Sequence, residues 1–186
     1  MTTPMNRRDA LKTTTALLGG VLVGSSGVLI ACDRGPRASA PRVLSPDDQA
    51  LMEDIADTLL PTTAASPGAR EAGVGAAINL ILTDCYKPDA QQRVVAGLRQ
   101  FRTTCGERCG RGFGVLPRQE RELLLREIDA EALKSPEAHY FTLVRELAHG
   151  AYFSSRIGVT QALRYVATPG RFDGCVPLTP GQPAWA

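Results

Sequence analysis

The chain has few of the side chains that enzymes use for acid–base and metal chemistry. Its only histidines are His139 and His149, and neither lies at zinc-ligand spacing from a cysteine. Neither has a motif-placed partner of the kind that an acid–base site needs, so we expect each to cap a helix or to make an ordinary hydrogen bond. The sequence therefore predicts no catalytic residue and no metal ligand.

Cofactor motifs and strand patterns are also missing. No Gly-x-Gly-x-x-Gly follows a strand and no Cys-x-x-Cys-His occurs, so that nothing indicates a dinucleotide-binding fold or covalently attached haem. No stretch shows the sustained alternation of a strand bounded by hairpin turns. We therefore expect no cofactor in this chain and an all-α fold.

The chain also lacks an excess of charge of one sign. Without residues 1–31, acidic and basic side chains are equal in number, and the slight basicity of the full chain belongs to those first residues. The formal charge of the remainder is near zero. Nothing predicts binding to nucleic acid or to an anionic membrane surface by charge.

Residues 1–31 have the layout of an export signal. Arg7 and Arg8 precede an apolar run at 16–31 that is interrupted by glycine and serine. The run is shorter than the roughly 20 apolar residues that a membrane span needs. The paired arginines favour the twin-arginine (Tat) route, which exports folded proteins, with Asp9 and Ala10 in place of the usual polar–aromatic pair. We therefore expect a periplasmic protein.

Cys32 ends the stretch Leu29-Ile30-Ala31-Cys32, which resembles a bacterial lipobox. In such signals the cysteine becomes the first residue and carries lipid; a chance cysteine beside an ordinary cleavage site is the alternative. Asp33 resembles an inner-membrane retention signal. We expect a lipoprotein held by a lipid anchor at the outer face of the inner membrane, with residues 32–43 as a flexible linker.

The other cysteines are disulfide candidates, because an exported chain meets an oxidising compartment: Cys85, Cys105, Cys109 and Cys175. Four cysteines allow three pairings, and the sequence does not choose among them. Cys105 and Cys109 could close a small loop, and Cys175 could bridge within the chain or to a partner. A redox-active pair is disfavoured, because the spacing is not Cys-x-x-Cys and no thioredoxin-like pattern surrounds it.

Apolar periodicity predicts an all-α domain of about six helices at 44–167. Ser45 and Pro46 start a first helix that Pro61 ends. Further helices are expected at about 74–86, from Pro88 to a Gly-rich break at 106–114, from Pro117 through Leu133, from Ser135 through Ala148, and from Ser154 or Ser155 to Val166. Residues 168–186 are rich in proline and glycine and predict an extended, irregular C-terminal tail that is laid against another surface.

Paired acidic residues on the fourth predicted helix, such as Glu120-x-Glu122 and Glu127-x-Asp129, could suggest catalytic carboxylates. Arginines crowd the same helix, at Arg118, Arg121 and Arg126. We therefore interpret this helix as a solvated, ion-paired face.

Three blocks of sequence carry a family resemblance. The first is IADTLLP at 55–61 followed by PGAREAGV at 67–74, the second is GAYFSSRIG at 150–158, and the third is LRY at 163–165 with PGRFDGC at 169–175 and PAW at 183–185. Together they resemble the gluconate 2-dehydrogenase subunit 3 family, the small subunit of membrane-bound flavin sugar dehydrogenases. The resemblance covers about residues 51–186, although 87–135 matches only in helical character.

This resemblance implies an accessory subunit that is not itself an enzyme. Members of the family pair with a large flavoprotein of the glucose–methanol–choline (GMC) type, which binds FAD and oxidises a sugar or polyol. A multihaem cytochrome c often passes the electrons onward to quinone. The small subunit supplies the export signal and, like a chaperone, helps the large subunit mature. The lipobox departs from the simplest family pattern and adds membrane attachment of the complex to these expectations.

A partner interface is expected near the C-terminus, where aromatic residues gather in the second and third blocks. Its candidate residues are Tyr152, Phe153, Tyr165, Pro169, Gly170, Phe172, Cys175 and Trp185. Aromatic side chains are enriched at interfaces, but packing within the domain is the alternative. The two interpretations are equal for Tyr152 and Tyr165, whereas the interface is favoured for Phe172 and Trp185.

A different class of function is a free-standing periplasmic helical lipoprotein that acts as a binding module. A neighbouring reading frame for a large flavoprotein without its own signal would favour the accessory subunit. The sequence does not name the sugar or alcohol, because the substrate chemistry would lie in the partner.

Overall fold

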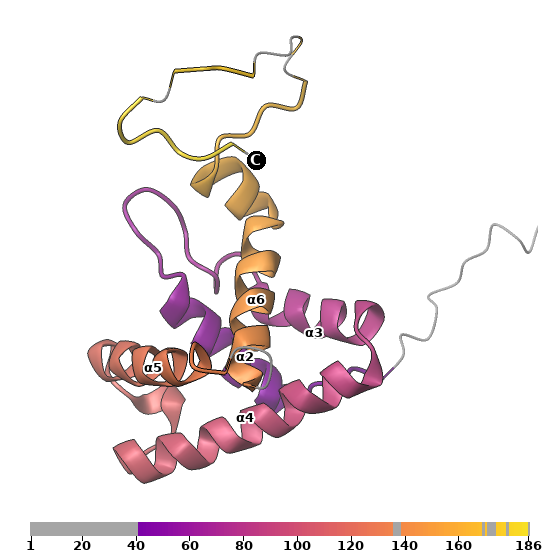
Figure 1. Cartoon of the computed structure of the whole chain (residues 1–186), viewed down its shortest axis with the longest axis vertical. Helices are drawn as coiled ribbons and strands as arrows, with labels where there is room; N and C mark the ends of the chain where they lie inside the picture. The colour runs from indigo at the N-terminus through magenta and orange to yellow at the C-terminus, as the bar shows by residue number, and fades with distance from the viewer. Residues whose placement is uncertain (1–40, 136–138, 169, 171–173, 178, 186) are drawn as a thin grey trace, which may run out of the picture. The chain divides into compact units, whose positions relative to one another are not determined.

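The fold was analysed in a computed structural model, which describes residues 41–135, 139–168, 170, 174–177 and 179–185. These residues form the helices α2 (Pro46–Leu59), α3 (Val74–Cys85), α4 (Pro88–Cys109), α5 (Arg118–Ala132) and α6 (Tyr140–Phe153), and two short helical segments, η2 (Phe113–Val115) and η3 (Gly158–Ala162) (Figure 1). Within these ranges there is no strand, only an isolated bridge between Arg164 and Trp185. The predicted all-α class is confirmed.

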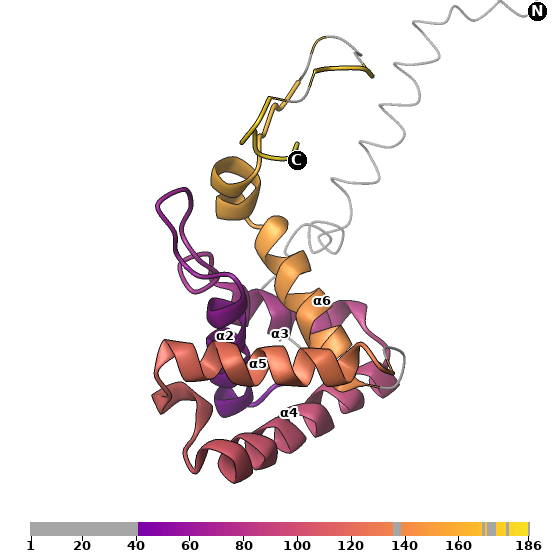
Figure 2. The ribbon, with the colours of Figure 1, turned by 60° about the vertical axis from the view of Figure 1, so that its left-hand side comes forward.

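Helix α6 is the centre of the helical domain, because it contacts α2, α3, α4 and α5 (Figures 1 and 2). The side chains that it buries are Tyr140, Phe141, Val144, Leu147, Ala148, Ala151 and Tyr152. Burial of each large apolar side chain contributes about 1.5–3 kcal/mol. The alanines let neighbouring helices approach closely, so that one helix can organise four others.

The start of α2 follows the prediction. The Ser45 hydroxyl accepts a hydrogen bond from the Asp48 N–H at 3.1 Å and donates one to the Asp48 carboxylate at 2.7 Å, and Pro46 occupies the first turn. Asp48 also accepts a hydrogen bond from Arg102 of α4 at 2.6 Å. The cap therefore fixes the helix start and ties α2 to α4.

The chain enters the domain along α3, where the amide of Asn79 holds it. Asn79 is buried; it accepts from the Leu44 N–H at 3.0 Å and donates to the Leu44 carbonyl at 3.1 Å. The Val43 N–H donates to the Thr83 hydroxyl at 3.2 Å. Because both polar atoms of the Asn79 amide are hydrogen-bonded, the cost of removing the amide from water is offset. Residues 43 and 44 are therefore held at one position along α3.

Two helix boundaries differ from the predictions. The glycine-rich break at 106–114 begins later than expected, because α4 continues through Gly106 to Cys109 and stops at Gly110, whose φ of +65° forms a left-handed C-cap. The last helix does not reach Val166. Leu163 is extended, and the Arg164 N–H donates to the Ala184 carbonyl instead of continuing the helix.

The fifth predicted helix begins later than its Ser-Pro-Glu start suggested. Helix α6 begins at Tyr140, and the imidazole of His139 accepts from the Phe141 N–H at 3.2 Å as its cap. Residues 136–138 lie outside the described ranges. The predicted role of His139 as a capping residue is confirmed.

We predict opposite effects for two Gly→Ala substitutions on α4. A Cβ on Gly97 would overlap the ring of Tyr140, whereas a Cβ on Gly106 would meet no atom within 4 Å. Overpacking costs about 1–3 kcal/mol, and alanine in a helix interior gains about 1 kcal/mol over glycine. Urea unfolding should show Gly106→Ala at least as stable as the wild type and Gly97→Ala less stable than Gly106→Ala by about 1–3 kcal/mol. Equal stabilities would contradict the close contact between α4 and α6.

We also predict an acid-sensitive contribution from Asp48. Burial opposes its ionisation, but the hydrogen bonds from Ser45 and Arg102 outweigh burial and hold its pKa below the usual value. The stabilisation is therefore present above the unfolded pKa of about 4 and is lost as the pH falls through the lower folded pKa. Between about pH 6 and pH 3, Asp48→Asn should lose less free energy of unfolding than the wild type. Asp84→Asn, at an exposed site on α3, should keep the wild-type slope.

Candidate partner interface

One end of the helical domain brings together segments that are far apart in the sequence. The loop between α2 and α3 rises beside the C-terminal half of α6, and η3 and the C-terminal residues follow from that end of α6 (Figures 1 and 2). The first two blocks of the family resemblance meet here, and the described residues of the third block follow from the same end of α6. Sequence spacing predicted the blocks but not that they share one end of the domain.

The hydroxyl of Tyr152 joins the first block to the second. It donates to the Pro67 carbonyl at 2.7 Å and lies 3.3 Å from the Ser66 hydroxyl. Tyr152 is buried, so its ring packs within the domain and is not available as a contact surface. Of the two interpretations left open for this residue, the structure favours packing.

The α2–α3 loop is itself closely folded. The Gly68 N–H donates to the Thr62 hydroxyl at 2.9 Å, and the Ala69 N–H donates to the Leu60 carbonyl at 2.8 Å. A Cβ on Gly68 would lie 2.5 Å from the Thr62 nitrogen, which leaves room only for glycine. The proline-glycine pair of the first block therefore lets the loop turn back toward Tyr152.

Arg70 in the same block attaches the loop to α2 by charge. Its guanidinium lies 2.6 Å from Asp54, 3.4 Å from Asp57 and 3.9 Å from Glu53. The hydrogen bond with Asp54 raises the pKa of Arg70, in spite of partial burial. Because the guanidinium is about half exposed, solvent screening keeps the contribution of each pair to stability small.

The second block ends in a tight junction between α6 and η3. The Ser155 hydroxyl donates to the Tyr152 carbonyl at 2.6 Å and accepts from the Gly158 N–H at 3.0 Å. A Cβ on Gly158 would overlap the Tyr152 carbonyl oxygen. Glycine at this position therefore allows η3 to pack directly against the end of α6.

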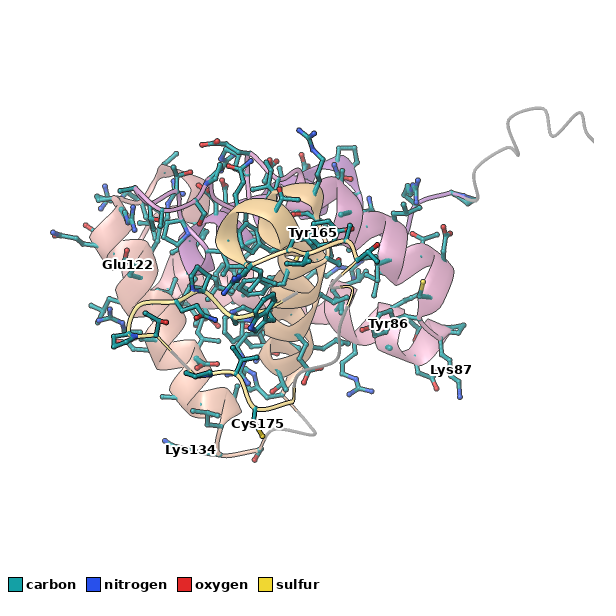
Figure 3. The ribbon with its side chains drawn as sticks, turned by 90° about the horizontal axis from the view of Figure 1, so that it is seen from above. Tyr86, Lys87, Glu122, Lys134, Tyr165 and Cys175 are labelled. Atoms are coloured by element: carbon teal, nitrogen blue, oxygen red, sulfur yellow. The ribbon has the colours of Figure 1, made fainter. Side chains whose placement is uncertain are left out.

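Beyond η3 lies the arm, by which we mean the described residues from Leu163 to Trp185. Its two ends meet: the Arg164 N–H donates to the Ala184 carbonyl at 2.7 Å, and the Arg164 guanidinium lies 4.2 Å from the centre of the Trp185 ring. Figure 3 looks onto this end of the domain, with Tyr165 and Cys175 labelled. The arm is irregular, as predicted.

The other candidate interface residues are exposed wherever the structure describes them. Tyr165 is 54% exposed, Trp185 49% and Phe153 37%, while Gly170 and Cys175 are exposed as well. Pro169 and Phe172 lie outside the described residues, as do Arg7, Arg8 and Cys32 of the predicted export signal. The exposed aromatic residues thus concentrate on the arm and on the end of α6 from which it departs.

The four cysteines that were disulfide candidates are free thiols in the structure. Cys105 and Cys109 lie one turn apart on α4 and therefore do not enclose a small loop, which was one of the possibilities that the sequence left open. Burial of Cys105, together with the neighbouring Cys109, raises the pKa of its thiol, and its Sγ donates to the Arg111 carbonyl at 3.3 Å. A raised pKa disfavours the thiolate that redox chemistry requires.

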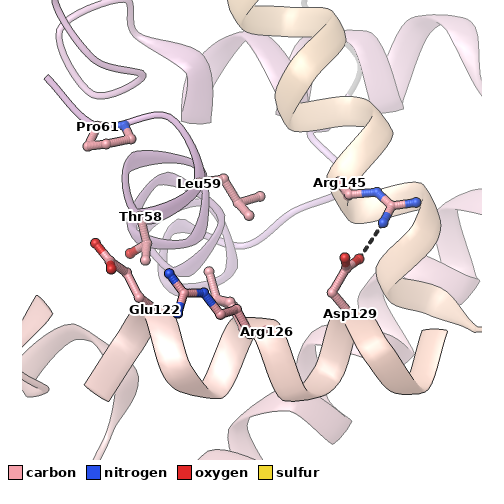
Figure 4. Close-up of a pocket in the computed structure, with 8 residues that line it drawn as sticks. Thr58, Leu59, Pro61, Glu122, Arg126, Asp129 and Arg145 are labelled. Atoms are coloured by element: carbon pink, nitrogen blue, oxygen red, sulfur yellow. Dashed lines mark hydrogen bonds and ion pairs between the residues drawn. The ribbon is translucent and has the colours of Figure 1, made fainter. Parts of the chain in front are cut away.

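A cleft of about 360 Å³ with both polar and apolar walls lies between the end of α2, α5 and α6 (Figure 4). Sequence reasoning did not find it, because its residues come from three separate helices and the loop after α2: Thr58, Leu59, Pro61, Glu122, Leu125, Arg126, Asp129 and Arg145. Arg145 is ion-paired with Asp129, and Glu122 is paired with Arg118 at 2.8 Å. The hydrogen bond from Arg118 lowers the pKa of Glu122.

This pairing confirms the ion-paired face that was predicted for α5. Three further pairs join α5 to α4 and to the loop after α4: Arg108 with Glu127 at 3.2 Å, Arg108 with Glu131 at 2.8 Å, and Arg111 with Glu120 at 3.0 Å. These pairs link α5 to neighbouring segments and so support packing between the helices.

The described residues show two further features that bear on function. His149 makes an ordinary contact, with its Nδ1 3.0 Å from the Arg145 carbonyl, as expected. In the described ranges we find no group of three or more side chains suited to hold a metal ion, and no helix there is both long and apolar enough to cross a membrane.

Comparison with known families gives one match. The model of the family described as gluconate 2-dehydrogenase subunit 3 matches residues 46–170, more than half of the chain. The match begins at the first residue of α2 and ends in the arm, so that it includes the first two blocks and the start of the third. No curated protein and no solved structure matches the chain.

We predict that Tyr152→Phe detaches the α2–α3 loop from α6. The Pro67 carbonyl would lose its donor, at a cost of about 0.5–1.5 kcal/mol in the free energy of unfolding, measured in urea. Limited proteolysis within residues 62–67 should quicken at the same time. Tyr165→Phe is the matched control, because that ring is exposed, and it should leave both measurements unchanged. Equal behaviour of the two variants would contradict the role of the tyrosine hydroxyl.

Proposed function

The chain belongs to the gluconate 2-dehydrogenase subunit 3 family, and from this membership we propose that it is the non-catalytic small subunit of a periplasmic, FAD-dependent sugar or polyol dehydrogenase. The proposed partner is a large GMC-type flavoprotein that carries both the FAD and the catalysis. A multihaem cytochrome c, which often accompanies members of this family, is a further proposed partner. The proposal assigns no cofactor to this chain.

The observation that carries the proposal is the family match across nearly all of the helical domain. The chemistry of the described residues supports it. Both histidines serve helix structure, and the clustered carboxylates are paired with arginines. The blocks that resemble the family converge on one end of the domain, where exposed aromatic residues lie. These properties are those of a subunit that binds a partner and carries out no reaction itself.

The proposed role in export follows from the first residues of the sequence. Arg7 and Arg8 form a twin-arginine signal, and this route carries proteins that have already folded around a cofactor. One signal on the small subunit can therefore serve both chains, provided that they associate before export. The proposed lipid on Cys32 would then hold the assembled complex at the membrane, where electrons pass to quinone.

We predict that the flavoprotein subunit depends on this chain. Co-expression of the two subunits should give flavin content and dye-linked dehydrogenase activity in the periplasm. Expression without this chain, or with the double substitution Arg7→Lys and Arg8→Lys, should remove most of both, because the flavoprotein then lacks a route across the membrane. Lys12→Arg is the matched control, since it changes a basic residue outside the arginine pair, and it should export normally.

An exported and equally active flavoprotein made in the absence of this chain would contradict the proposal. Export of this chain alone, with no flavoprotein associated, would favour a free-standing binding module. The cleft beside Arg126 would then be the first place to look for a ligand.

A further inference from the structure

The base of the arm is closed by two contacts of different kinds. One is the backbone hydrogen bond from the Arg164 N–H to the Ala184 carbonyl, and the other is the guanidinium of Arg164 over the ring of Trp185. Both involve the first residues after η3 and the last described residues of the chain. We call this pair of contacts the base clasp. Trp185 is the only tryptophan in the sequence.

The returning segment has its own local structure. The Gln182 N–H donates to the Thr179 carbonyl at 3.0 Å, with Pro180 and Gly181 between them and a φ of +77° at Gly181. Proline followed by a glycine of positive φ is the pattern of a type II turn. Pro177, Pro180 and Pro183 further restrict the backbone. The turn at 179–182 and the clasp at Arg164 are therefore contacts that the described part of the arm makes within itself.

The arm exposes apolar side chains. Tyr165, Val166, Val176 and Trp185 are each at least 39% exposed. Single exposed apolar residues are ordinary, but several on one short segment indicate an interaction surface. Ordering such a segment costs conformational entropy, and a segment ordered in advance loses less of it on binding.

The sequence of the arm indicates the chemistry of what it contacts. From Gly174 to Trp185 there is no charged residue, so an electrostatic contact with anionic lipid or nucleic acid is disfavoured. Insertion into lipid is disfavoured too, because the carbonyls of an irregular backbone would lack donors there. An uncharged, proline-rich segment fits an apolar groove on a folded protein, where aromatic walls contact the side chains and polar groups pair with the backbone.

We propose that the arm is a preorganised docking element, closed by the base clasp, that inserts into an apolar groove on the large flavoprotein subunit. This inference rests on the proposed function. It adds a second role to Trp185, which was expected to contact the partner. Trp185 is also a positioning residue, whose ring on Arg164 holds the two ends of the arm together.

Substitution of Arg164 tests the clasp. Arg164→Ala removes the guanidinium, and Arg164→Pro removes the backbone donor as well. Arg156→Ala, at an exposed position before η3, is the matched control. In the purified full chain, acrylamide should quench Trp185 fluorescence more strongly in both Arg164 variants than in the wild type or the control. Affinity for the flavoprotein should fall about two- to fivefold for Arg164→Ala, as the loss of an exposed cation–π contact allows, and further for Arg164→Pro.

Alkylation of two exposed cysteines tests the docking itself. Cys175 lies on the arm, and Cys85 lies at the end of α3 and serves as an internal control. Under reducing conditions, peptide-resolved labelling with a maleimide should show Cys175 protected in the purified complex and reactive after the subunits are separated. Cys85 should react equally in both states.

The Arg164 variants should retain the wild-type helix content by circular dichroism, because the arm lies outside the helical core.

The outcomes separate this inference from the proposed function. If the wild-type chain co-purifies with the flavoprotein but Cys175 stays as reactive as in the free chain, the docking inference is wrong and the proposed function stands. Unchanged affinity of both Arg164 variants would equally overturn it. If the wild-type chain binds no flavoprotein, the docking inference and the proposed function are both wrong. A blue shift of Trp185 emission with phosphatidylglycerol vesicles, and no protection of Cys175 in the complex, would assign the arm to lipid instead.

Discussion

Burial of α6 among four other helices is the constraint on which the rest of the molecule depends. The hydrophobic face of this one helix is the surface against which α2, α3, α4 and α5 all pack. Close contacts at Gly97 and Gly158 set how near α4 and η3 can approach it. Because the packed end of α6 also carries Tyr152, the position of the α2–α3 loop and the origin of the arm follow from the same packing.

The chemistry of the described residues divides between two regions. The helical body pairs its charges internally, through ion pairs such as Arg145 with Asp129 and Arg118 with Glu122. The arm has no charge between Gly174 and Trp185 and exposes its apolar side chains. A body with several internal ion pairs and an uncharged extension is suited to a subunit that contributes a binding surface to a complex, which agrees with its family.

Local signals in the sequence predicted the all-α class and most helix starts, because caps and proline positions act within a few residues. Ser45 and Pro46 show this for α2. The predictions were wrong where contacts between residues far apart in the sequence, or burial, determine where a helix ends and what a side chain contacts. Glycine costs about 1 kcal/mol in a helix, but Phe101 and Cys105 are buried just before Gly106 and Cys109 packs partly against the core after it, which keeps α4 intact to Cys109. The end of η3 depends on the hydrogen bond from the Arg164 N–H to the Ala184 carbonyl. The position of the Tyr152 side chain depends on its hydrogen bond to the Pro67 carbonyl. Neither pairing leaves a periodic pattern.

The amide of Asn79 has a mechanical consequence. Its two hydrogen bonds with Leu44 fix the point at which the chain leaves the helical body toward its N-terminus. A pull on the chain from its N-terminal side would act first on these bonds and on the one from the Val43 N–H to Thr83, because they hold the first described residues of the body. The buried side chain of one asparagine therefore helps to determine where such a force enters the helical body.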